Sequence, residues 1–295
     1  VCSAETLERL LGKNGLELKR CALGEDNSPV SRLDEKSVPK SIGRSVTRGA
    51  DFITPDEISA ILDALHIQKG SYVCVQASDR FCKHIIGEEQ AILNVLMDRI
   101  GTEGCLFMPT FSFSTLDPSC LATNVEYEDW KKIREWQLGY HPILTSCDQN
   151  GALANQFLKN ENVTRTTHPV YSFAFWGNTK EKEIDQRSNF PLSFTHALSS
   201  FADQQAINLL FDKGPEESVL LPAIAKTLNK GVTSLQRAVI KKGKNNAVKT
   251  FLVTEIDGME EELLGYCYKK ETRLGKFPIY RISLDEIQET EAVMD

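Results

Sequence analysis

The stretch from Thr164 to Gly177, TRTTHPVYSFAFWG, carries residues whose side chains could do chemistry. Pro169 restricts the residue before it, His168, to an extended backbone conformation, which aims the imidazole to one side of a strand or turn. An imidazole in such a place could act as a general base or donate a hydrogen bond to a ligand oxygen. It could equally do no more than bond a backbone carbonyl at a corner of the fold. The sequence alone leaves both interpretations of His168 open.

Arg165 and Thr166 precede this histidine in the same stretch. A guanidinium and a hydroxyl are groups that bind phosphate oxygens or the carboxylates of an acidic partner. We therefore expect Arg165 and Thr166 to bind an anionic part of a ligand. A surface ion pair is the alternative for Arg165.

Further candidates lie near a buried strand predicted at SYVCVQ. Ser78 and Arg80 follow its carboxyl end, which is where open α/β sheets place their ligands. Gly87 precedes a predicted helix and permits a close approach of the backbone. Cys82 and His84 have C-x-H spacing, but no second pair lies nearby in the sequence, so no metal site is predicted.

The composition is that of an acidic protein, with a formal net charge of −7 over 295 residues. The one basic run, KKGKNN at 241–246, is short and has no interleaved aromatic residues, which argues against a nucleic-acid partner. The acidity suits a cationic small molecule instead. No apolar run approaches the roughly 18 residues of a membrane span, so no membrane partner is predicted. The eight cysteines are scattered and form no C-x-x-C pair, which predicts reduced thiols and a cytoplasmic location.

The first 49 residues differ in character from the rest of the chain. Residues 1–21 predict a helix and then a strand, a unit that resembles the last helix and strand of a class I methyltransferase. Residues 22–49 are rich in Ser, Gly, Pro and charged residues, which is typical of a linker. We therefore expect an N-terminal extension at 1–49, in keeping with the tail of an upstream methyltransferase domain, and a main domain at 50–295. A homo-oligomer is also compatible with the sequence.

The main domain predicts a succession of helices and strands. Thr54, Pro55 and Glu57 have the pattern of a capping box at the start of a helix. A strand at SYVCVQ, a helix at 88–100 and a strand at CLFMPTF predict a βαβ unit with parallel strands. Beyond this unit we predict helices at 148–159, 216–229, 256–264 and 284–294, and strands at 206–212, 248–253 and 277–282. The sum is an α/β fold with an open mixed sheet flanked by helices.

Three segments resemble, in order and spacing, the antibiotic N-acetyltransferase family, whose members acetylate the 3-amino group of aminoglycosides from acetyl-CoA. They are 66–113, which contains CLFMPTFSF; 141–177, with its GALA helix and its RTTHPVYSFAFWG ending; and 190–212. The resemblance implies an open α/β sheet with the thioester bound in a crevice beside it, and a ternary complex without a covalent acyl-enzyme. It also implies acetyl-CoA or another acyl-CoA as co-substrate, and a small amine or hydroxyl acceptor such as an amino sugar or a biosynthetic intermediate.

Within the matched segments the candidate residues take definite roles. A base near neutral pKa and oriented donors for the oxyanion are what acyl transfer to an amine needs. His168 is then the catalytic candidate. The acyl-CoA-binding candidates are Ser78, Arg80, Gly87, Arg165 and Thr166. The substrate-binding candidates are Thr110 and Ser172, and no metal is implied.

The sequence departs from the family at the usual catalytic segment. The family has a T-x-x-H-x-x-E helix whose His and Glu are the catalytic base and its partner, whereas the matching stretch here reads ESVLLPAIAKTL. Leu221 and Ile224 occupy those two positions. Gln76 likewise replaces the leading His of an H-S-S-L turn, and His196 is a candidate substitute for the lost base.

These departures leave three hypotheses about function. The first is an acyl-CoA-dependent acyltransferase with an altered mechanism. The second is a catalytically silent member of the family that serves as a binding or assembly module. The third is a scaffold recruited to another reaction on a tethered substrate, which the sequence does not separate from the first. A crevice open at His168, with a carboxylate within hydrogen-bond reach, favours the enzyme; a crevice filled by Leu221 and Pro222 favours the module.

Overall fold

The computed structural model describes residues 52–121, 125–179 and 206–283. The chain divides into two units, Val1–Ala50 and Asp51–Asp295, and every described residue belongs to the second. Several sequence predictions therefore lie outside the described residues. They are the helix and strand within 1–21, the linker at 22–49, the helix at 284–294, and His196.

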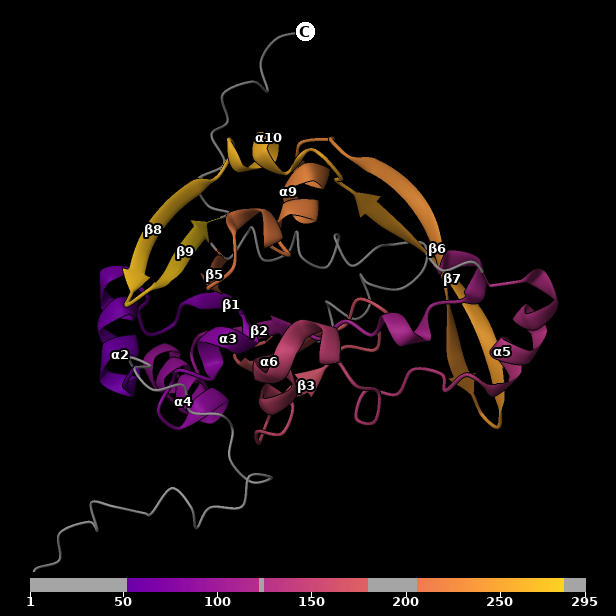
Figure 1. Ribbon diagram of the computed structural model, residues 1–295, viewed down its shortest axis with the longest axis horizontal. Coiled ribbons are helices and arrows are strands. Elements are labelled where there is room, and N and C mark those ends of the chain that lie inside the picture. Colours follow the sequence, from indigo (N-terminus) through magenta and orange to yellow (C-terminus); the bar gives the residue numbers. More distant parts are fainter. Residues whose placement is uncertain (1–51, 122–124, 180–205, 284–295) are drawn as a thin grey trace, which may run out of the picture. The chain divides into compact units, whose positions relative to one another are not determined.

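Seven strands of the described residues form one mixed sheet in the order β3-β4-β2-β1-β5-β9-β8. β1 pairs in parallel with β2 and with β5, while the outer pairs are antiparallel (Figure 1). The bounds are β1 Tyr72–Ala77, β2 Cys105–Pro109, β3 Thr164–Arg165, β4 Phe173–Gly177, β5 Ile207–Phe211, β8 Tyr268–Leu274 and β9 Phe277–Ser283. The predicted α/β class, mixed sheet and parallel βαβ unit are confirmed.

A second sheet consists of a long hairpin of β6 (Val232–Lys242) and β7 (Asn245–Glu255). Its turn carries the basic run at 241–246. The run contains the last two residues of β6, the turn at Gly243 and Lys244, and the first two residues of β7. β6 and β8 were not predicted as strands.

The helices begin and end for identifiable local reasons. In the first, Thr54 accepts the N–H of Glu57 and Glu57 accepts the N–H of Thr54, so the predicted capping box is present. Three helices are shorter than predicted. A 3₁₀ turn precedes two of them, Asp148–Asn150 before α6 and Pro215–Glu217 before α9, and the third, predicted at 256–264, begins at Glu260. The bounds are α2 Pro55–Ala64, α3 Asp79–Cys82, α4 Glu88–Ile100, α5 Trp130–Trp136, α6 Gly151–Phe157, α9 Leu221–Thr227 and α10 Glu260–Leu264.

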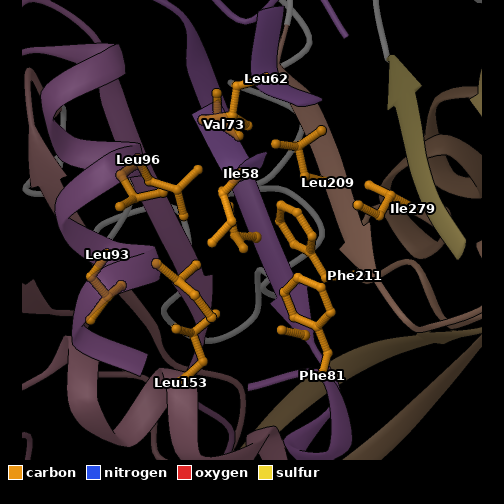
Figure 2. Close-up of a cluster of buried hydrophobic side chains, with 14 of the residues drawn as sticks. Ile58, Leu62, Val73, Phe81, Leu93, Leu96, Leu153, Leu209, Phe211 and Ile279 are labelled. Atoms are coloured by element: carbon orange, nitrogen blue, oxygen red, sulfur yellow. The ribbon is translucent and has the colours of Figure 1, made fainter. Parts of the chain in front are cut away.

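The sheet has an apolar core on each face, because successive side chains of a strand point to opposite sides. On β1, Val73 and Val75 join the core under α2, α4 and α6, of which Figure 2 shows a part, while Cys74 joins the core under α9 and α10. Each fully buried side chain of this size contributes about 1.5–3 kcal/mol relative to an exposed one. The two cores therefore fix the carboxyl ends of β1, β2 and β5 in space. In the described ranges, no helix combines the length and the apolar character that a membrane span requires.

Candidate functional site

The carboxyl end of β1 is the point at which the strand order of the parallel core reverses. β1 leads through α4 to β2 on one side, while β5 pairs with it on the other. Loops that leave a sheet at such a point diverge, and open α/β sheets bind their ligands in the resulting crevice. A small crevice of about 40 Å³ lies here, lined by β1, β2, α6 with the turn that precedes it, and the residue Lys213. We call it the switch-point crevice.

The lining of this crevice combines apolar and amide side chains. Val75, Met108 and Leu153 supply the apolar part, and Gln149 and Asn150 are among the polar residues. The side-chain oxygen of Asn150 is buried and accepts no hydrogen bond from the described part of the chain. Because buried polar atoms are nearly always paired, this oxygen favours a ligand that brings an N–H donor into the crevice.

Ser78 and Arg80 lie just past the lining of the crevice and are both bonded to Asp212. The Ser78 hydroxyl donates to Oδ2 of Asp212 at 2.5 Å and accepts the N–H of Phe81, so that it also caps α3. Arg80 donates through Nε to the same oxygen at 2.9 Å and forms an ion pair with the other. Burial alone would raise the pKa of Asp212, but the bonds from Arg80 and Ser78 outweigh it and lower that pKa. The acyl-CoA role predicted for Ser78 and Arg80 stays a prediction, now with both groups tied to a carboxylate.

Gly87 is the residue before α4 and has a left-handed backbone with φ of 85°. A Cβ atom there would lie 2.9 Å from that of Ala91, so a side chain would clash with the first turn of the helix. This geometry gives Gly87 a sufficient structural reason to be glycine. Its predicted role in binding acyl-CoA stays a prediction.

Arg165, Thr110 and Ser172 meet in one buried network. Nε of Arg165 donates to the hydroxyls of Thr110 and Ser172 at 3.1 and 3.0 Å, and Nη2 donates to the Thr110 carbonyl at 2.6 Å. The remaining bonds go to Ser112 Oγ and to the carbonyls of Pro142 and Thr145. Every nitrogen of the guanidinium is therefore engaged within the protein. The structure brings these three predicted residues together, but as a brace that holds β2, β4 and the 142–145 loop.

His168 lies in a turn and is 3 % exposed. Its Nδ1 accepts the backbone N–H groups of Val170 and Tyr171 at 3.2 and 2.9 Å, so the proton of the neutral ring is on Nε2. Nε2 is buried and has no partner in the described residues, and the nearest rings are those of Phe251 and Tyr171. The contacts match the structural interpretation of His168, with backbone amides in place of the expected carbonyl.

A second histidine makes the same turn in an exposed place. His141 also precedes a proline, and its Nδ1 accepts the N–H groups of Ile143 and Leu144 at 3.2 and 3.3 Å. The hydrogen bonding of His168 is therefore what a His-Pro sequence forms locally. Thr166 is similarly engaged, because its hydroxyl accepts the N–H of Phe173 at 3.0 Å.

Burial makes His168 hard to protonate. Desolvation, aided by the charge of Lys249, lowers the pKa of His168 to about 3. A base needs a pKa near the working pH to take a proton efficiently. With the proton of the ring already on Nε2, His168 has no free lone pair to offer a substrate.

Leu221 and Ile224, at the positions of the family's catalytic pair, are fully buried in the core under α9. Neither lines the switch-point crevice. The crevice is therefore not filled by these two residues, and the base that they replace is not supplied by another histidine at this helix.

A second crevice, of about 380 Å³, lies on the other face of the sheet. Phe111 and Tyr171 line it with their rings, which meet edge to face at 5.2 Å. Four acidic residues also line it: Glu216, Glu217, Glu255 and Asp257. We call it the acidic crevice. Carboxylates beside aromatic faces are the groups that bind organic cations.

Residues 213–219 form the wall between the two crevices. Lys213 lines the switch-point crevice and Glu217 lines the acidic crevice, and their side chains form an ion pair. The carboxamide of Gln76 fixes this wall to the end of β1. Its Nε2 donates to the carbonyl of Glu217 and its Oε1 accepts the N–H of Val219, both at 3.0 Å.

The charged residues of this wall and of the acidic crevice were not predicted from the sequence. One sequence pattern did indicate a site here, because KGPEES directly follows the carboxyl end of a predicted strand, where ligands bind. The overall acidity had also suggested a cationic small molecule. Neither signal showed which carboxylates come together.

Three buried thiols of the described chain, Cys82, Cys105 and Cys147, are poorly suited to act as nucleophiles. Burial raises the pKa of Cys82 and of Cys105 to about 12, so neither forms a thiolate at neutral pH. Cys147 is buried and donates to the side chain of Asn155. Within the described ranges, no three His, Cys, Asp or Glu residues gather as ligands of a metal ion.

A parallel core with a crevice at its switch point and an acidic crevice on the other face of the sheet defines an α/β protein with two candidate ligand sites. The family model described as aminoglycoside 3-N-acetyltransferase matches residues 74–290, so the chain belongs to this family. The resemblance found in the sequence is thereby confirmed.

Two curated relatives match about half of the chain. The SPbeta prophage-derived aminoglycoside N(3')-acetyltransferase-like protein YokD of Bacillus subtilis (strain 168) is 32% identical over 143 residues, which are 48% of this chain and 52% of the relative. Aminoglycoside N(3)-acetyltransferase VIII of Streptomyces fradiae is 27% identical over 157 residues, 52% of this chain and 51% of the relative. The chain thus matches about half the length of each of these relatives.

Solved structures share the fold over a larger part of the chain. The crystal structure of YokD from Bacillus subtilis superposes with a TM-score of 0.70 at 23% identity, over 80% of this chain and 90% of that one. AAC-IIIb in a binary complex with CoASH gives a TM-score of 0.64 at 14% identity, over 80% and 93% of the two chains. At these identities the likeness concerns the fold.

Proposed function

We propose that this protein is an acyltransferase that moves an acyl group from acyl-CoA to an amine or hydroxyl of a cationic small molecule such as an amino sugar. The observation that carries the proposal is the pair of crevices on either side of the wall 213–219. One has the position and the amide lining for a thioester donor, and the other has the charge for a cationic acceptor. A reaction between the two ligands needs their reacting atoms to come within about 3–3.5 Å of each other, so the proposal requires the bound ligands to meet at the edge of this wall.

The switch-point crevice, of about 40 Å³, suits the thioester end of acyl-CoA and not its whole pantetheine arm. Val75, Met108 and Leu153 provide an apolar wall, and the side-chain oxygen of Asn150, which has no partner among the described residues, can accept an amide N–H of the donor. The same-fold structure of AAC-IIIb was solved with CoASH, which supports CoA as the carrier of the acyl group.

The acidic crevice suits an acceptor with several ammonium groups. Its carboxylates attract positive charge, and the Phe111 and Tyr171 rings can cover a sugar or ammonium face. The names of the two curated relatives, both N-acetyltransferases of aminoglycosides or proteins like them, support an amino-sugar acceptor.

A thiol-release assay tests the proposal directly. Purified full-length chain is incubated with acetyl-CoA or a longer acyl-CoA and a panel of amino sugars, and free CoA is measured with a thiol reagent. We expect release that depends on both substrates and saturates with each. Release that ignores the acceptor, or no calorimetric binding of any acyl-CoA to the folded protein, contradicts the proposal.

The second candidate is a catalytically silent binding module. It is favoured by the burial of Leu221 and Ile224 where the family has its base and partner, and by the buried, backbone-bonded ring of His168. This candidate expects amino sugars to bind in the acidic crevice with no turnover of any acyl-CoA. Acceptor-dependent thiol release excludes it.

A further inference from the structure

The reaction proposed above needs two groups that the usual family positions do not provide. An amine must lose a proton as it attacks a thioester carbonyl, and the carbonyl oxygen gains negative charge in the transition state. Leu221 and Ile224 can do neither, because their side chains are apolar and fully buried. The proton acceptor and the oxyanion partner must come from residues that reach the crevices.

Lys213 reaches the donor side. It directly follows Asp212, the residue after β5, and lines the switch-point crevice beside Gln76 and Pro109. Its side chain is 26% exposed, and its ammonium group pairs with Glu217. An ammonium of a residue that lines this crevice is the kind of group that stabilises an oxyanion.

Glu217 reaches the acceptor side. It lines the acidic crevice, and its Oε1 accepts the backbone N–H of Gly214 at 3.0 Å. Its own backbone carbonyl is held by Gln76. Its two carboxylate oxygens are therefore fixed by Gly214 and Lys213 of the same wall, whereas an ordinary surface glutamate is free to rotate.

The other carboxylates of the acidic crevice lack this connection. Glu255 accepts the hydroxyl of Ser234 and lies on β7, and Glu216 and Asp257 line only the acidic crevice. Of the four, Glu217 is the one paired with a cation that lines the switch-point crevice. It alone joins the two ligand sites.

We infer that the Lys213–Glu217 pair replaces the catalytic His and Glu of the family, with Glu217 as general base and Lys213 as oxyanion partner and acid. This inference rests on the proposed function. The amine nitrogen attacks the thioester carbonyl carbon and the C–N bond forms, while Glu217 takes a proton from the nitrogen and Lys213 faces the oxyanion. The C–S bond then breaks, and the departing thiolate takes a proton from Lys213. Glu217 returns its proton to Lys213 across the ion pair, which leaves amide, free thiol and the enzyme in its starting state.

The test uses the full chain with acetyl-CoA and an amino sugar that wild type acetylates. We expect Glu217→Gln and Lys213→Met each to lower kcat by about 100-fold or more. Lys213→Arg keeps the charge and should retain more activity than Lys213→Met. The matched controls are Glu103→Gln and Lys69→Met, which break an exposed ion pair outside both crevices and should leave kcat unchanged.

Chemical rescue separates catalysis from structure. In Glu217→Ala, added formate should restore part of kcat, because a small carboxylate can enter the space left by the side chain, whereas a variant that is merely misfolded gains nothing. Urea unfolding and calorimetric titration with CoA confirm that each variant folds and binds the donor.

The outcomes separate this inference from the function on which it rests. Wild-type turnover with unchanged kcat in Glu217→Gln and Lys213→Met overturns the catalytic pair and leaves the acyltransferase standing. Loss of kcat without formate rescue and with impaired CoA binding also overturns it, in favour of a structural role. No turnover by wild type with any acyl-CoA overturns both.

Discussion

The 164–173 region and the wall 213–219 differ in what their polar side chains contact. The first contains RTTHP, the part most like the family, and its polar groups bind one another: Arg165 braces loops and His168 closes a turn. The second departs from the family, and its charged groups face two crevices. Likeness to a family motif therefore marks conserved architecture as readily as it marks reactive groups.

The largest effect should come from removing the brace. Arg165→Met leaves the carbonyls of Thr110, Pro142 and Thr145 without their donor in a buried setting, so we expect the free energy of unfolding to fall by about 3–5 kcal/mol. Urea unfolding followed by fluorescence measures this loss, with the exposed Arg237→Met as control. If Arg165→Met loses no more unfolding free energy than Arg237→Met, Arg165 is not a structural brace and is available to bind a ligand.

The next effect is a dependence of stability on pH that originates at His168. Its pKa is lowered to about 3 in the folded state, whereas an unfolded histidine has a pKa of about 6.5. The unfolded state therefore binds the proton first as pH falls below 6.5, and stability is lost from there down to about pH 3. Between pH 7 and pH 5 the loss from this one residue should be about 2 kcal/mol.

Urea unfolding at pH 7 and at pH 5 measures this loss of stability. The variant His168→Asn keeps an acceptor for the backbone amides but cannot titrate, so its stability should fall less over this range than that of wild type. His141→Asn is the matched control, because that exposed ring makes the same turn and its replacement should leave the wild-type pH dependence in place.

A smaller effect should follow from releasing the wall. Gln76→Ala removes both hydrogen bonds that hold residues 217–219 to β1, and we expect about 1–2 kcal/mol of destabilisation. If the wall positions reacting groups, kcat should fall more than this modest change suggests, with KM for the donor nearly unchanged. If the distant control Lys69→Met loses as much kcat and as much stability as Gln76→Ala, then Gln76 has no positioning role.

The smallest effect on stability should come from the wall's own ion pair. Lys213→Met and Glu217→Gln remove a pair whose two side chains are 26% and 45% exposed, and such pairs contribute little because solvent screens them. We expect changes within about 0.5 kcal/mol by urea unfolding. If either variant is strongly destabilised, the Lys213–Glu217 pair is structural, and the wall 213–219 then does not differ from the 164–173 region.

The sequence predicted the parallel core well because its strands and helices are locally consistent. The capping box at Thr54, the buried strand β1 and the amphipathic α4 each follow from a short pattern. β6 escaped prediction because its apolar residues, Val232, Leu235 and 238–240, do not alternate with polar ones as they do in a half-buried strand. α9 begins later than expected because Pro222 favours the first turn of a helix.

The candidate site was predicted only in part. The position of Ser78 and Arg80 correctly indicated the carboxyl end of β1, next to the switch-point crevice. Gln76 and Leu221 were recognised as departures from the family, but no sequence pattern shows that Lys213 and Glu217, which pair with each other, line different crevices. That depends on the tertiary contact between Gln76 and Val219, residues 143 positions apart in the chain.

The backbone at Asp212 has a consequence for how rigid this site is. Its φ of 54° is a conformation that glycine adopts without strain and aspartate adopts at some cost. The carboxylate bonds to Ser78 and Arg80, and the Asp212 N–H donates to the carbonyl of Pro278 at 2.8 Å. A glycine would relieve the strain but would let the chain sample many directions after β5. With aspartate, the chain has a small local strain, but its hydrogen bonds fix the backbone direction that leads to Lys213. The backbone at Lys213 therefore loses little conformational entropy when a ligand binds in the crevice.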